Sequence, residues 1–553
     1  MRRLLLLLLL LAIPAFAGDI YITQNASGSD TGANCANAHS AAWFNSNAVG
    51  GNTYHLCGTF TGAANASPIL TVPADGTAGN PLIVLAESGA LFTAPYWSGN
   101  YIDSGELHGA IVNGHNYVIL DGGTNGTIQN TASGTALTYQ LSTWGMASTG
   151  NNVIIRNWTI QNIYVATNAA IVSQADRTVD LELGGTNVTV CNNLLTYAYA
   201  GIMDLATGSS STQVNDCQAN TFGTGVNIFL NTFQNQPWNL NISPGVAASH
   251  NVYANSFQLA GPWGIRVSGC AGTDAHTDGI IVYNTNAAMV SPFIYNNEFN
   301  GSLGNGCPTA HIFCSYGTAT AGSSCTVFNN VFIETGSYSQ NAAAILTNGN
   351  ASQSTGPTKV YNNTFTGSQI AYAPQNAYVR IPNETFWNNV TTSTSSFQGA
   401  LWEDYYTKET FSMLSTDHNA YYAPNNTSSP FHLNGADYAN LTAWKNACVA
   451  GSGVTCDSNS IYGNPNLDAN YKPQAGSNAI GLGANLTSSC TGQMAPLCYD
   501  KPPSVGKGGS LGGNVQRPTG STPWDAGAYQ YGSGGSTKTA LSPMFAQLWP
   551  IPN

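Results

Sequence analysis

The sequence feature that most constrains the fold is a short phrase that returns along the chain. Each copy holds β-favouring residues, then Asn, one further residue and an aromatic residue. The copies lie at residues 252–257, 294–299, 327–332 and 360–365, with a weaker one at 228–233. The fixed residues Asn297, Asn330 and Asn363 are about thirty residues apart, a period typical of repeat and solenoid architectures.

A repeat of this length is too long for one hairpin but suits a coil of three short strands joined by turns. One coil cannot bury its own apolar side chains, whereas stacked coils bury a continuous column. Equivalent Asn side chains would then lie above one another and form a hydrogen-bonded amide ladder. The repeat therefore predicts a parallel β-solenoid.

The composition agrees with turns and uncharged β surfaces. Charged residues make up 7% of the 553 residues, so the Lys and Glu of exposed helix faces are scarce. Hydrophobic residues at 42% and aromatic residues at 10% argue against disorder. The net charge of −12 and the lack of a basic patch argue against binding to nucleic acid or to an anionic membrane.

The first residues are typical of an export signal. Arg2 and Arg3 precede an apolar run at residues 4–11, and Ala15 and Ala17 form a small-x-small cleavage site. The run is too short for a permanent membrane span. We therefore predict a secreted or cell-surface protein.

The expected organisation has four parts. A signal peptide (1–17) precedes a parallel β-helix with an N-terminal cap (18–400), C-terminal coils with a covering segment (401–531), and a Gly/Ser linker with an apolar tail (532–553). Short helices are expected at residues 41–44, capping the stack, and at 441–449.

The twelve Cys residues are interpreted as disulfides of an oxidising compartment. Zinc is the alternative, but no CxxC pair occurs in the sequence. Proximity alone suggests Cys35–Cys57, Cys191–Cys217, Cys314–Cys325, Cys448–Cys456 and Cys490–Cys498, which leaves Cys270 and Cys307.

Five stretches form characteristic short phrases, at residues 21–32, 76–84 and 116–122 near the start and at 476–481 and 517–529 near the end. These phrases resemble those of secreted bacterial right-handed parallel β-helix proteins of the pectate-lyase-like superfamily. The resemblance implies an all-β, right-handed parallel β-helix with capped ends. Its members include polysaccharide lyases, glycoside hydrolases, epimerases and surface proteins, so the fold alone does not choose the function.

The densest cluster of the rare charges is the candidate catalytic site. His276 and Asp278 are two residues apart, so they would share one face of a strand and could act as a general acid/base pair. Arg266 follows an equivalent Gly-Ile pair and would lie about 5 Å away, one strand spacing, where it could hold a sugar carboxylate. The alternative is that Asp278 begins a turn and His276 lies on the surface. Asp274, Trp263 and Tyr283 are the candidate substrate contacts, with core packing as the alternative for the aromatic residues.

Weaker candidates lie elsewhere. Asp180 and Glu182 alternate, so they would share one face and could bind Ca²⁺ or form a carboxylate pair, with a solvated strand face as the alternative. Asp204 is a further candidate, Trp238 could stack on a sugar ring, and His250 is assigned a structural role.

The chain departs from the enzymes that it resembles. Lyases of this fold generally pair Ca²⁺-binding acids or a carboxylate neutraliser with a catalytic Lys or Arg, yet residues 18–356 contain no Lys. Polygalacturonases of this fold carry adjacent Asp residues, and no Asp-Asp occurs. The cofactor therefore stays open, with Ca²⁺ as a candidate, and no metal-binding residue is assigned.

The expected function is that of an extracellular carbohydrate-active protein. We expect a polysaccharide lyase or glycoside hydrolase acting in a groove along the β-helix, with a polysaccharide as its partner. The alternative is a non-catalytic cell-surface, adhesive or fibre-forming protein, based on the low charge, the many Cys residues and the apolar tail.

Overall fold

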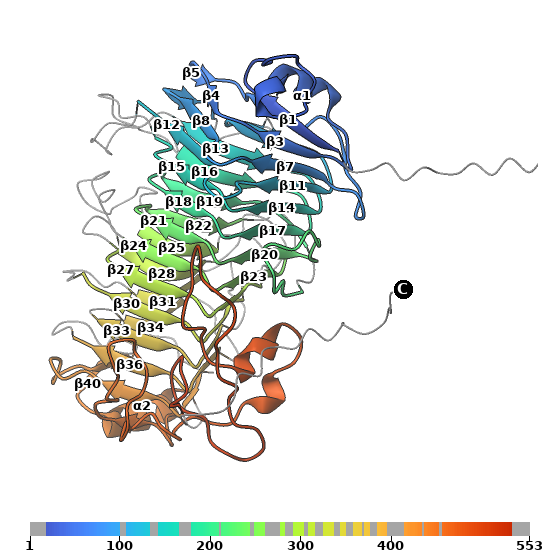
Figure 1. Cartoon of the computed structure of the whole chain (residues 1–553). Helices are drawn as coiled ribbons and strands as arrows, with labels where there is room; N and C mark the ends of the chain where they lie inside the picture. The colour runs from blue at the N-terminus through green and yellow to red at the C-terminus, as the bar shows by residue number, and fades with distance from the viewer. Residues whose placement is uncertain are drawn as a thin grey trace, which may run out of the picture.

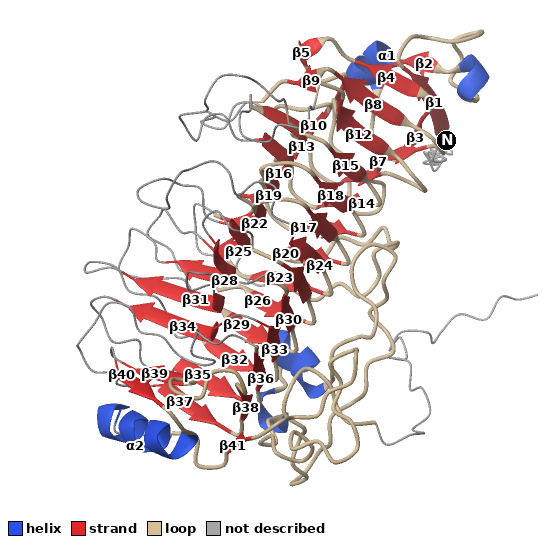
Figure 2. Cartoon of the chain, turned by 90° about the vertical axis from the view of Figure 1, so that its left-hand side faces the viewer, coloured by secondary structure: helices blue, strands red, loops and turns tan. Residues whose placement is uncertain are grey.

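The structure is a computed structural model, and Figures 1 and 2 show it in two views. The residues that it describes are 18–99, 107–132, 142–164, 178–208, 212–243, 248–259, 277–282, 291–303, 308–315, 324–336, 343–349, 358–367, 370–376, 384–394, 414–433, 436–452 and 456–532.

Three long parallel sheets, which we call A, B and D, run the length of the molecule. Sheet A has the order β2 (His39–Ser40), β1 (Asp19–Thr23), β3 (Thr53–Leu56), β7 (Leu82–Ala86), β11 (Val118–Asp121), β14 (Val153–Arg156), β17 (Val188–Cys191), β20 (Val226–Phe229), β23 (His250–Tyr253), β26 (Phe293–Tyr295), β29 (Thr326–Phe328), β32 (Lys359–Tyr361), β35 (Glu384–Trp387) and β37 (Leu414–Asp417).

Sheets B and D repeat the pattern. Sheet B has the order β4 (Thr59–Thr61), β8 (Leu91–Ala94), β12 (Thr127–Asn130), β15 (Thr159–Gln161), β18 (Leu194–Thr196), β21 (Thr232–Gln234), β24 (Ser256–Leu259), β27 (Glu298–Gly301), β30 (Val331–Glu334), β33 (Thr364–Gly367), β36 (Val390–Ser393), β38 (Ala420–Tyr422) and β41 (Ile461–Tyr462). Sheet D has the order β6 (Leu70–Thr71), β10 (Ile111–Asn113), β13 (Thr143–Ser148), β16 (Thr178–Leu183), β19 (Ala200–Asp204), β22 (Trp238–Ile242), β25 (Thr277–Val282), β28 (Pro308–Ser315), β31 (Ala343–Gly349) and β34 (Ile370–Asn376).

Each coil visits the sheets in the order D, A, B, as β13, β14 and β15 do, and the next coil pairs in parallel with it. The chain is thus a right-handed parallel β-helix, and the fold predicted from the repeat and from the resemblance is confirmed. A small sheet C joins β5 (Ala64–Ala66) to β9 (Tyr96–Trp97).

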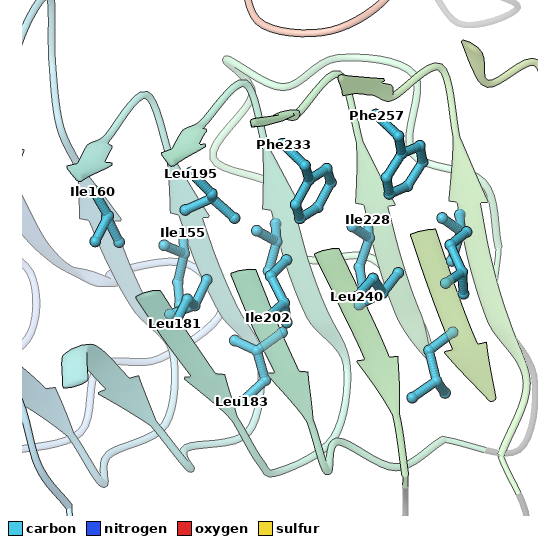
Figure 3. Packing of buried hydrophobic residues seen from close by; sticks show 14 of the residues in the cluster. Ile155, Ile160, Leu181, Leu183, Leu195, Ile202, Ile228, Phe233, Leu240 and Phe257 are labelled. Carbon is cyan, nitrogen blue, oxygen red and sulfur yellow. The ribbon is translucent and has the colours of Figure 1, made fainter. Parts of the chain in front are cut away.

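Like residues stack on like in the core, as Figure 3 shows for the aliphatic side chains and for Phe233 and Phe257. The closing aromatic of each repeat phrase points inward. Its ring lies 4.8, 4.5, 4.7 and 4.9 Å from the next along the series Phe233, Phe257, Phe299, Phe332 and Phe365. The phrase therefore repeats because each copy contributes one layer of the same column.

The predicted Asn ladder is present at the turn between sheets A and B, which we call the A–B corner. Each side-chain N–H donates to the amide oxygen of the next Asn over 2.9 to 3.3 Å, through Asn193, Asn231, Asn255, Asn297, Asn330, Asn363, Asn389 and Asn419. The left-handed backbone falls on the residue before the ladder Asn, for example Ala254 (φ 53°) and Asn296 (φ 58°). Two adjacent residues of the turn therefore have different roles. The first adopts the left-handed backbone conformation, and the Asn that follows makes the ladder hydrogen bonds.

Both predicted helices are confirmed, and they lie at opposite ends of the stack (Figure 1). Helix α1 (Ala41–Asn47) begins at Ser40, whose side chain accepts from the Trp43 N–H, and buries Phe44 against Tyr54. Helix α2 (Leu441–Ser452) and the hairpin of β39 (Phe431–Leu433) and β40 (Ala436–Tyr438) cover the other end, where Trp444 stacks on Phe431. Three 3₁₀ helices complete the described elements: η1 (Cys35–Asn37), η3 (Thr487–Ser489) and η4 (Gly492–Cys498).

The five disulfides suggested by proximity are confirmed. The remaining two residues, Cys270 and Cys307, lie outside the described residues. None of the helices in the described ranges is long and apolar enough to cross a membrane.

The last part of the chain turns back along the outside of the β-helix (Figure 1). We call residues 482–530 the arm. Its contacts follow the A–B corner backwards, from Leu482 on His418 to Ala484 on Asn388 and then to Gly506 on Ala254 and Gly508 on Asn192. It covers an outer aromatic column of sheet A, in which Phe229, Tyr253, Tyr295 and Phe328 stack.

Candidate functional site

Side chains along the strands of sheet D do not alternate strictly between the inner and the outer face. This irregularity determines on which face Asp180 and Glu182 lie. On β16, Leu181 packs in the main core, whereas Val179 belongs to a separate apolar cluster with Trp144 and Trp238. Asp180 lies between them in the same column as Gly145, whose added Cβ would meet Ile160 of the core, so Asp180 and Leu181 both face inward. Glu182 pairs with Met203 of the outer cluster. The expectation that Asp180 and Glu182 share one face is therefore wrong.

The outer face of sheet D is apolar and aromatic, with two carboxylates. One outer column crosses the sheet through Trp144, Val179, Ala200, Trp238, Asp278, Ala310 and Ala343, and the other through Ala147, Glu182, Met203, Asn241, Ile281, Phe313, Leu346 and Ala373. In a chain with so few charges, this face combines side chains that can stack on a sugar ring with side chains that can exchange a proton.

Asp278 is the predicted catalytic residue that the structure describes. It lies on β25 between Trp238 and Ala310 of the neighbouring strands, and its Oδ1 accepts the Ala310 N–H over 3.3 Å. The side chain is buried, and this burial raises the pKa of Asp278 well above the usual value, while the Ala310 N–H opposes the shift. A carboxyl group in this environment favours its neutral form and can serve as a proton donor.

Glu182 is too far from Asp278 to form a glycosidase pair with it. Their strands β16 and β25 are separated by β19 and β22, which gives three strand spacings, or about 14 Å, along the axis. Inverting glycosidases hold their carboxyl groups roughly 6.5–9.5 Å apart, and retaining enzymes closer still. Glu182 and Asp278 therefore do not form such a pair.

One aromatic side chain of this face, Trp238, lies beside Asp278. The ring of Trp238, on the strand next to Asp278, is 5.3 Å from the ring of Tyr199. Three strands before β22 in sheet D, the ring of Trp144 contacts His108 edge-on at 5.4 Å. Trp238 was a weaker candidate in the sequence, and the structure places it beside Asp278.

The other predicted site residues, Arg266, His276, Asp274, Trp263 and Tyr283, lie outside the described residues. The two Gly-Ile pairs that the structure describes, at Gly201 and Gly279, lie on β19 and β25 of sheet D, with β22 between them.

Two further acids are paired with histidines inside the β-helix. Asp204 lies 3.1 Å from His250, with both side chains fully buried between sheets D and A. Glu334 lies 3.3 Å from His311, whose ring packs against Phe299 and Phe332. Asp204 therefore faces the core and not a surface, and the structural role assigned to His250 agrees with its burial.

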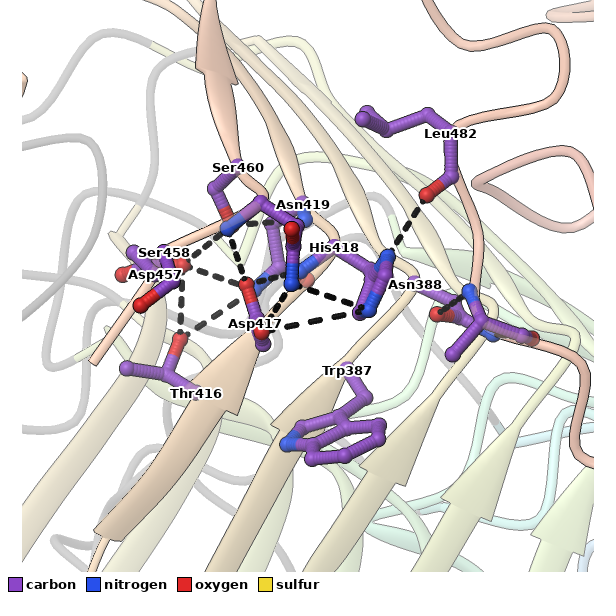
Figure 4. Close-up of polar contacts among 12 residues, drawn as sticks. Trp387, Asn388, Thr416, Asp417, His418, Asn419, Asp457, Ser458, Ser460 and Leu482 are labelled. Carbon is purple, nitrogen blue, oxygen red and sulfur yellow. Dashed lines mark hydrogen bonds and ion pairs between the residues drawn. The ribbon is translucent and has the colours of Figure 1, made fainter. Parts of the chain in front are cut away.

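A polar cluster that was not predicted from the sequence lies at the C-terminal end of sheet A (Figure 4). Asp417 accepts the backbone and side-chain N–H groups of Asn459 over 2.7 and 2.8 Å, and His418 Nδ1 donates to the Leu482 carbonyl over 2.8 Å. The signal was present, since Asn419-Ala420-Tyr421 is another copy of the repeat phrase. The cluster ends the ladder and anchors the arm.

Beneath it, the buried Asp457 terminates the ladder. It accepts from Trp444 Nε1 at 2.7 Å, Tyr421 at 3.0 Å and Asn419 at 3.2 Å. Burial raises the pKa of Asp457, and these donors oppose the shift. Asp457 thus pairs with Asn419, the last Asn of the ladder, and with Trp444 of the capping helix α2.

Among the described residues, no group of three or more His, Cys, Asp and Glu side chains is arranged to hold a metal ion. On the outer face of sheet D, the buried side chains of Asp278 and Trp238 lie on neighbouring strands.

Comparisons with known proteins give structural likeness only. No protein-family profile and no curated relative matches the chain. A solved structure of the pectate lyase Pel9A is similar over 94% of this chain and 97% of its own, with 14% identity and a TM-score of 0.41. The GH136 lacto-N-biosidase from Eubacterium ramulus is similar over 74% of this chain and 65% of its own, with 11% identity and a TM-score of 0.38. A mannuronic acid specific family 6 polysaccharide lyase from human gut microbiota is similar over 73% of this chain and 81% of its own, with 10% identity and a TM-score of 0.33.

Proposed function

We propose that the chain is an extracellular carbohydrate-active enzyme, a polysaccharide lyase or glycoside hydrolase, with its site on the outer face of sheet D around Asp278. The observation that carries the proposal is a buried carboxyl group of raised pKa beside Trp238 on an outer face of the β-helix. Perturbed carboxyl groups of this kind concentrate at catalytic sites.

Asp278 is the proton donor in this proposal. Its neutral carboxyl group gives a proton to the glycosidic oxygen as the C–O bond breaks. In hydrolysis, a water molecule forms the new bond to the sugar carbon. A base takes the proton that this water molecule loses. In β-elimination the base takes the proton next to the uronate carboxylate instead. His276, two residues earlier in the sequence, is the proposed base, and Arg266 the proposed partner of a sugar carboxylate. Asp274, Trp263 and Tyr283 complete the proposed substrate contacts.

The test is a screen of neutral and uronate-containing polysaccharides with the wild type and Asp278→Asn. Reducing ends report hydrolysis, and the absorbance of unsaturated products reports elimination. We expect kcat on a responsive substrate to fall by about 10²- to 10⁴-fold in Asp278→Asn, the usual contribution of a general acid.

Asp216→Asn is the matched control, because Asp216 is an exposed carboxylate away from sheet D. It should keep wild-type activity. If Asp278→Asn, folded as judged by its circular dichroism spectrum, cleaves at the wild-type rate, the assignment of Asp278 is wrong.

The second candidate function is binding without catalysis, as in a surface or adhesive protein. The apolar and aromatic character of the outer face favours it, because stacking on sugar rings needs no acid. Isothermal titration with each glycan separates the two. A binding protein would lose affinity in Trp238→Leu, keep it in Asp278→Asn, and release no product from any substrate.

The extracellular location is supported by the five disulfides, because such bonds persist in oxidising compartments. Fractionation of the producing cells should recover the protein outside the cytoplasm, and recovery of a reduced protein from the cytoplasm would contradict the proposal.

A further inference from the structure

Inside the β-helix, where sheets B and D meet, one line of positions is unusually polar. Sheet D contributes Asp180, Gly201 and Asn239 at equivalent positions of β16, β19 and β22. The facing line follows the left-handed residues Asn162, Tyr197 and Asn235 and consists of Ile163, Ala198 and Gln236. The main core surrounds these positions, including Leu181, Ile202, Leu240 and Phe233 in Figure 3.

Between Asp180 and Asn239, the two lines have little side-chain volume. The positions there are Gly201 and Ala198, so the side chain of Gln236 reaches past them toward Asp180. Gln236 Nε2 donates to Asp180 Oδ2, and a Cβ on Gly201 would fall 2.4 Å from Gln236 Oε1 and 2.5 Å from the Asn239 carbonyl oxygen. Gly201 thus leaves the room in which these oxygens lie.

Several polar atoms of this group have no hydrogen-bond partner within the part of the chain that the structure describes. They are Asp180 Oδ1, Gln236 Oε1, and both Nδ2 and Oδ1 of Asn239. The side chains of Asp180 and Asn239 are 0% exposed and that of Gln236 is 2% exposed. Each unsatisfied buried polar group costs about 1–3 kcal/mol, so this concentration of them in a packed core is unfavourable without a guest.

We propose that this corner holds an alkali-metal cation, Na⁺ or K⁺, bound by Asp180 and by the amide oxygens of Gln236 and Asn239. Carboxylate and amide oxygens are hard ligands that suit such ions, and the group contains no sulfur or imidazole ligand.

The charge of the site selects a monovalent ion. Asp180 is its one ionisable side chain, so a monovalent cation neutralises it, whereas a divalent cation would leave a positive charge buried without a partner. The rival guest is a proton on Asp180 together with water, which would satisfy the same oxygens without an added ion.

The competition between ion and proton gives a testable pH dependence. A cation binds the ionised carboxylate and must displace the proton, so stabilisation by the ion should grow as the pH rises.

The experiment measures the apparent Tm of the full chain in KCl, NaCl and choline chloride at equal ionic strength, at an acidic and at a mildly alkaline pH. We expect KCl or NaCl to raise the Tm by about 1 °C or more over choline chloride at the alkaline pH, and by less at the acidic pH. Asp180→Asn should abolish the difference between salts. Glu182→Gln, which changes a carboxylate on the outer face of the same strand, should keep it.

An equal Tm in all three salts for the wild type, or the same ion response in Asp180→Asn, would overturn the proposal in favour of a proton and water. If Asp180→Asn does not fold, crystals of the wild type grown with Tl⁺ in place of K⁺ decide the matter. An anomalous peak beside Asp180 supports the site, and its absence at full Tl⁺ exchange contradicts it.

Discussion

The ladder amides at the A–B corner satisfy one another, so each Asn carries more than its own contacts. Asn297 accepts from the backbone and side-chain N–H groups of Asn255 and donates to the Val252 carbonyl and to Asn330, each at 2.9 or 3.0 Å. The side chain is fully buried. Its removal leaves the Asn255 donors, the Val252 carbonyl and Asn330 Oδ1 without this partner.

We therefore expect Asn297→Ala to lower the free energy of unfolding by about 2–4 kcal/mol, the cost of one or two stranded buried groups. The measurement is the denaturant midpoint, followed by circular dichroism. Asn300→Ala changes an exposed residue on β27, the strand that follows Asn297, and should lie within about 0.5 kcal/mol of the wild type. A wild-type midpoint for Asn297→Ala would show that the ladder does not stabilise the stack.

Ionisation of Asp278 should also make the stability of the folded chain depend on pH. Its pKa is raised in the folded chain. A carboxyl group of this kind contributes its full stability below the unfolded pKa and loses it as the pH rises through the folded pKa, because the ionised form is disfavoured in the fold. Between about pH 5 and pH 8 the apparent Tm of the wild type should therefore fall more than that of Asp278→Asn. Calorimetry across this range checks it, with Asp216→Asn expected to follow the wild type, and parallel curves would contradict it.

At the scale of single elements, the buried cation of Arg517 helps to hold the arm. Arg517 is fully buried, donates to Asn329 Oδ1 at 3.0 Å and to the Gly527 carbonyl at 3.1 Å, and lies over the Trp524 ring. Burial lowers the pKa of Arg517 to about 10, and the charges of Asp500 and Asp525 oppose the shift. The arginine thus joins the A–B corner to the end of the arm.

Arg517→Met should loosen the arm without unfolding the coils, because it strands carbonyl groups of the arm and removes the hydrogen bond to Asn329 that ties the arm to the A–B corner. Limited proteolysis should then cut within residues 482–530 at least tenfold faster than in the wild type, while the remaining β-helix stays intact. Lys445→Met, on α2 and away from the arm, is the control and should be cut at the wild-type rate. Uniform degradation of the whole chain would contradict an independently released arm.

Local sequence explains which elements were predictable. The sequence predicts the stacked coils, the Asn ladder, both helices and five disulfides. Each of these depends on residues close in sequence or on a strict period. The faces of Asp180 and Glu182 were not predicted, because two consecutive residues of β16 face inward and the alternation shifts between them. A prediction that assumes strict two-residue alternation misses such a break in the inward and outward pattern.

At the scale of the whole molecule, the candidate site was only partly predictable. The sequence indicated Asp278 as a rare charge, but only the parallel register places Trp238 directly beside it, forty residues earlier in the chain. The His418 cluster and the course of the arm were missed, because their partners lie far away in sequence and follow no repeat.

The arm also changes how such a stack can come apart. Coils that touch only their neighbours can fray from either end. Here Lys507 donates to the backbone oxygens of Asn157 and Trp158, and the Leu482 carbonyl accepts from His418. The arm therefore contacts coils from β14 to β37. Peeling away the last coils must release this brace first, and the terminal coils should be lost together with the middle ones and not one at a time.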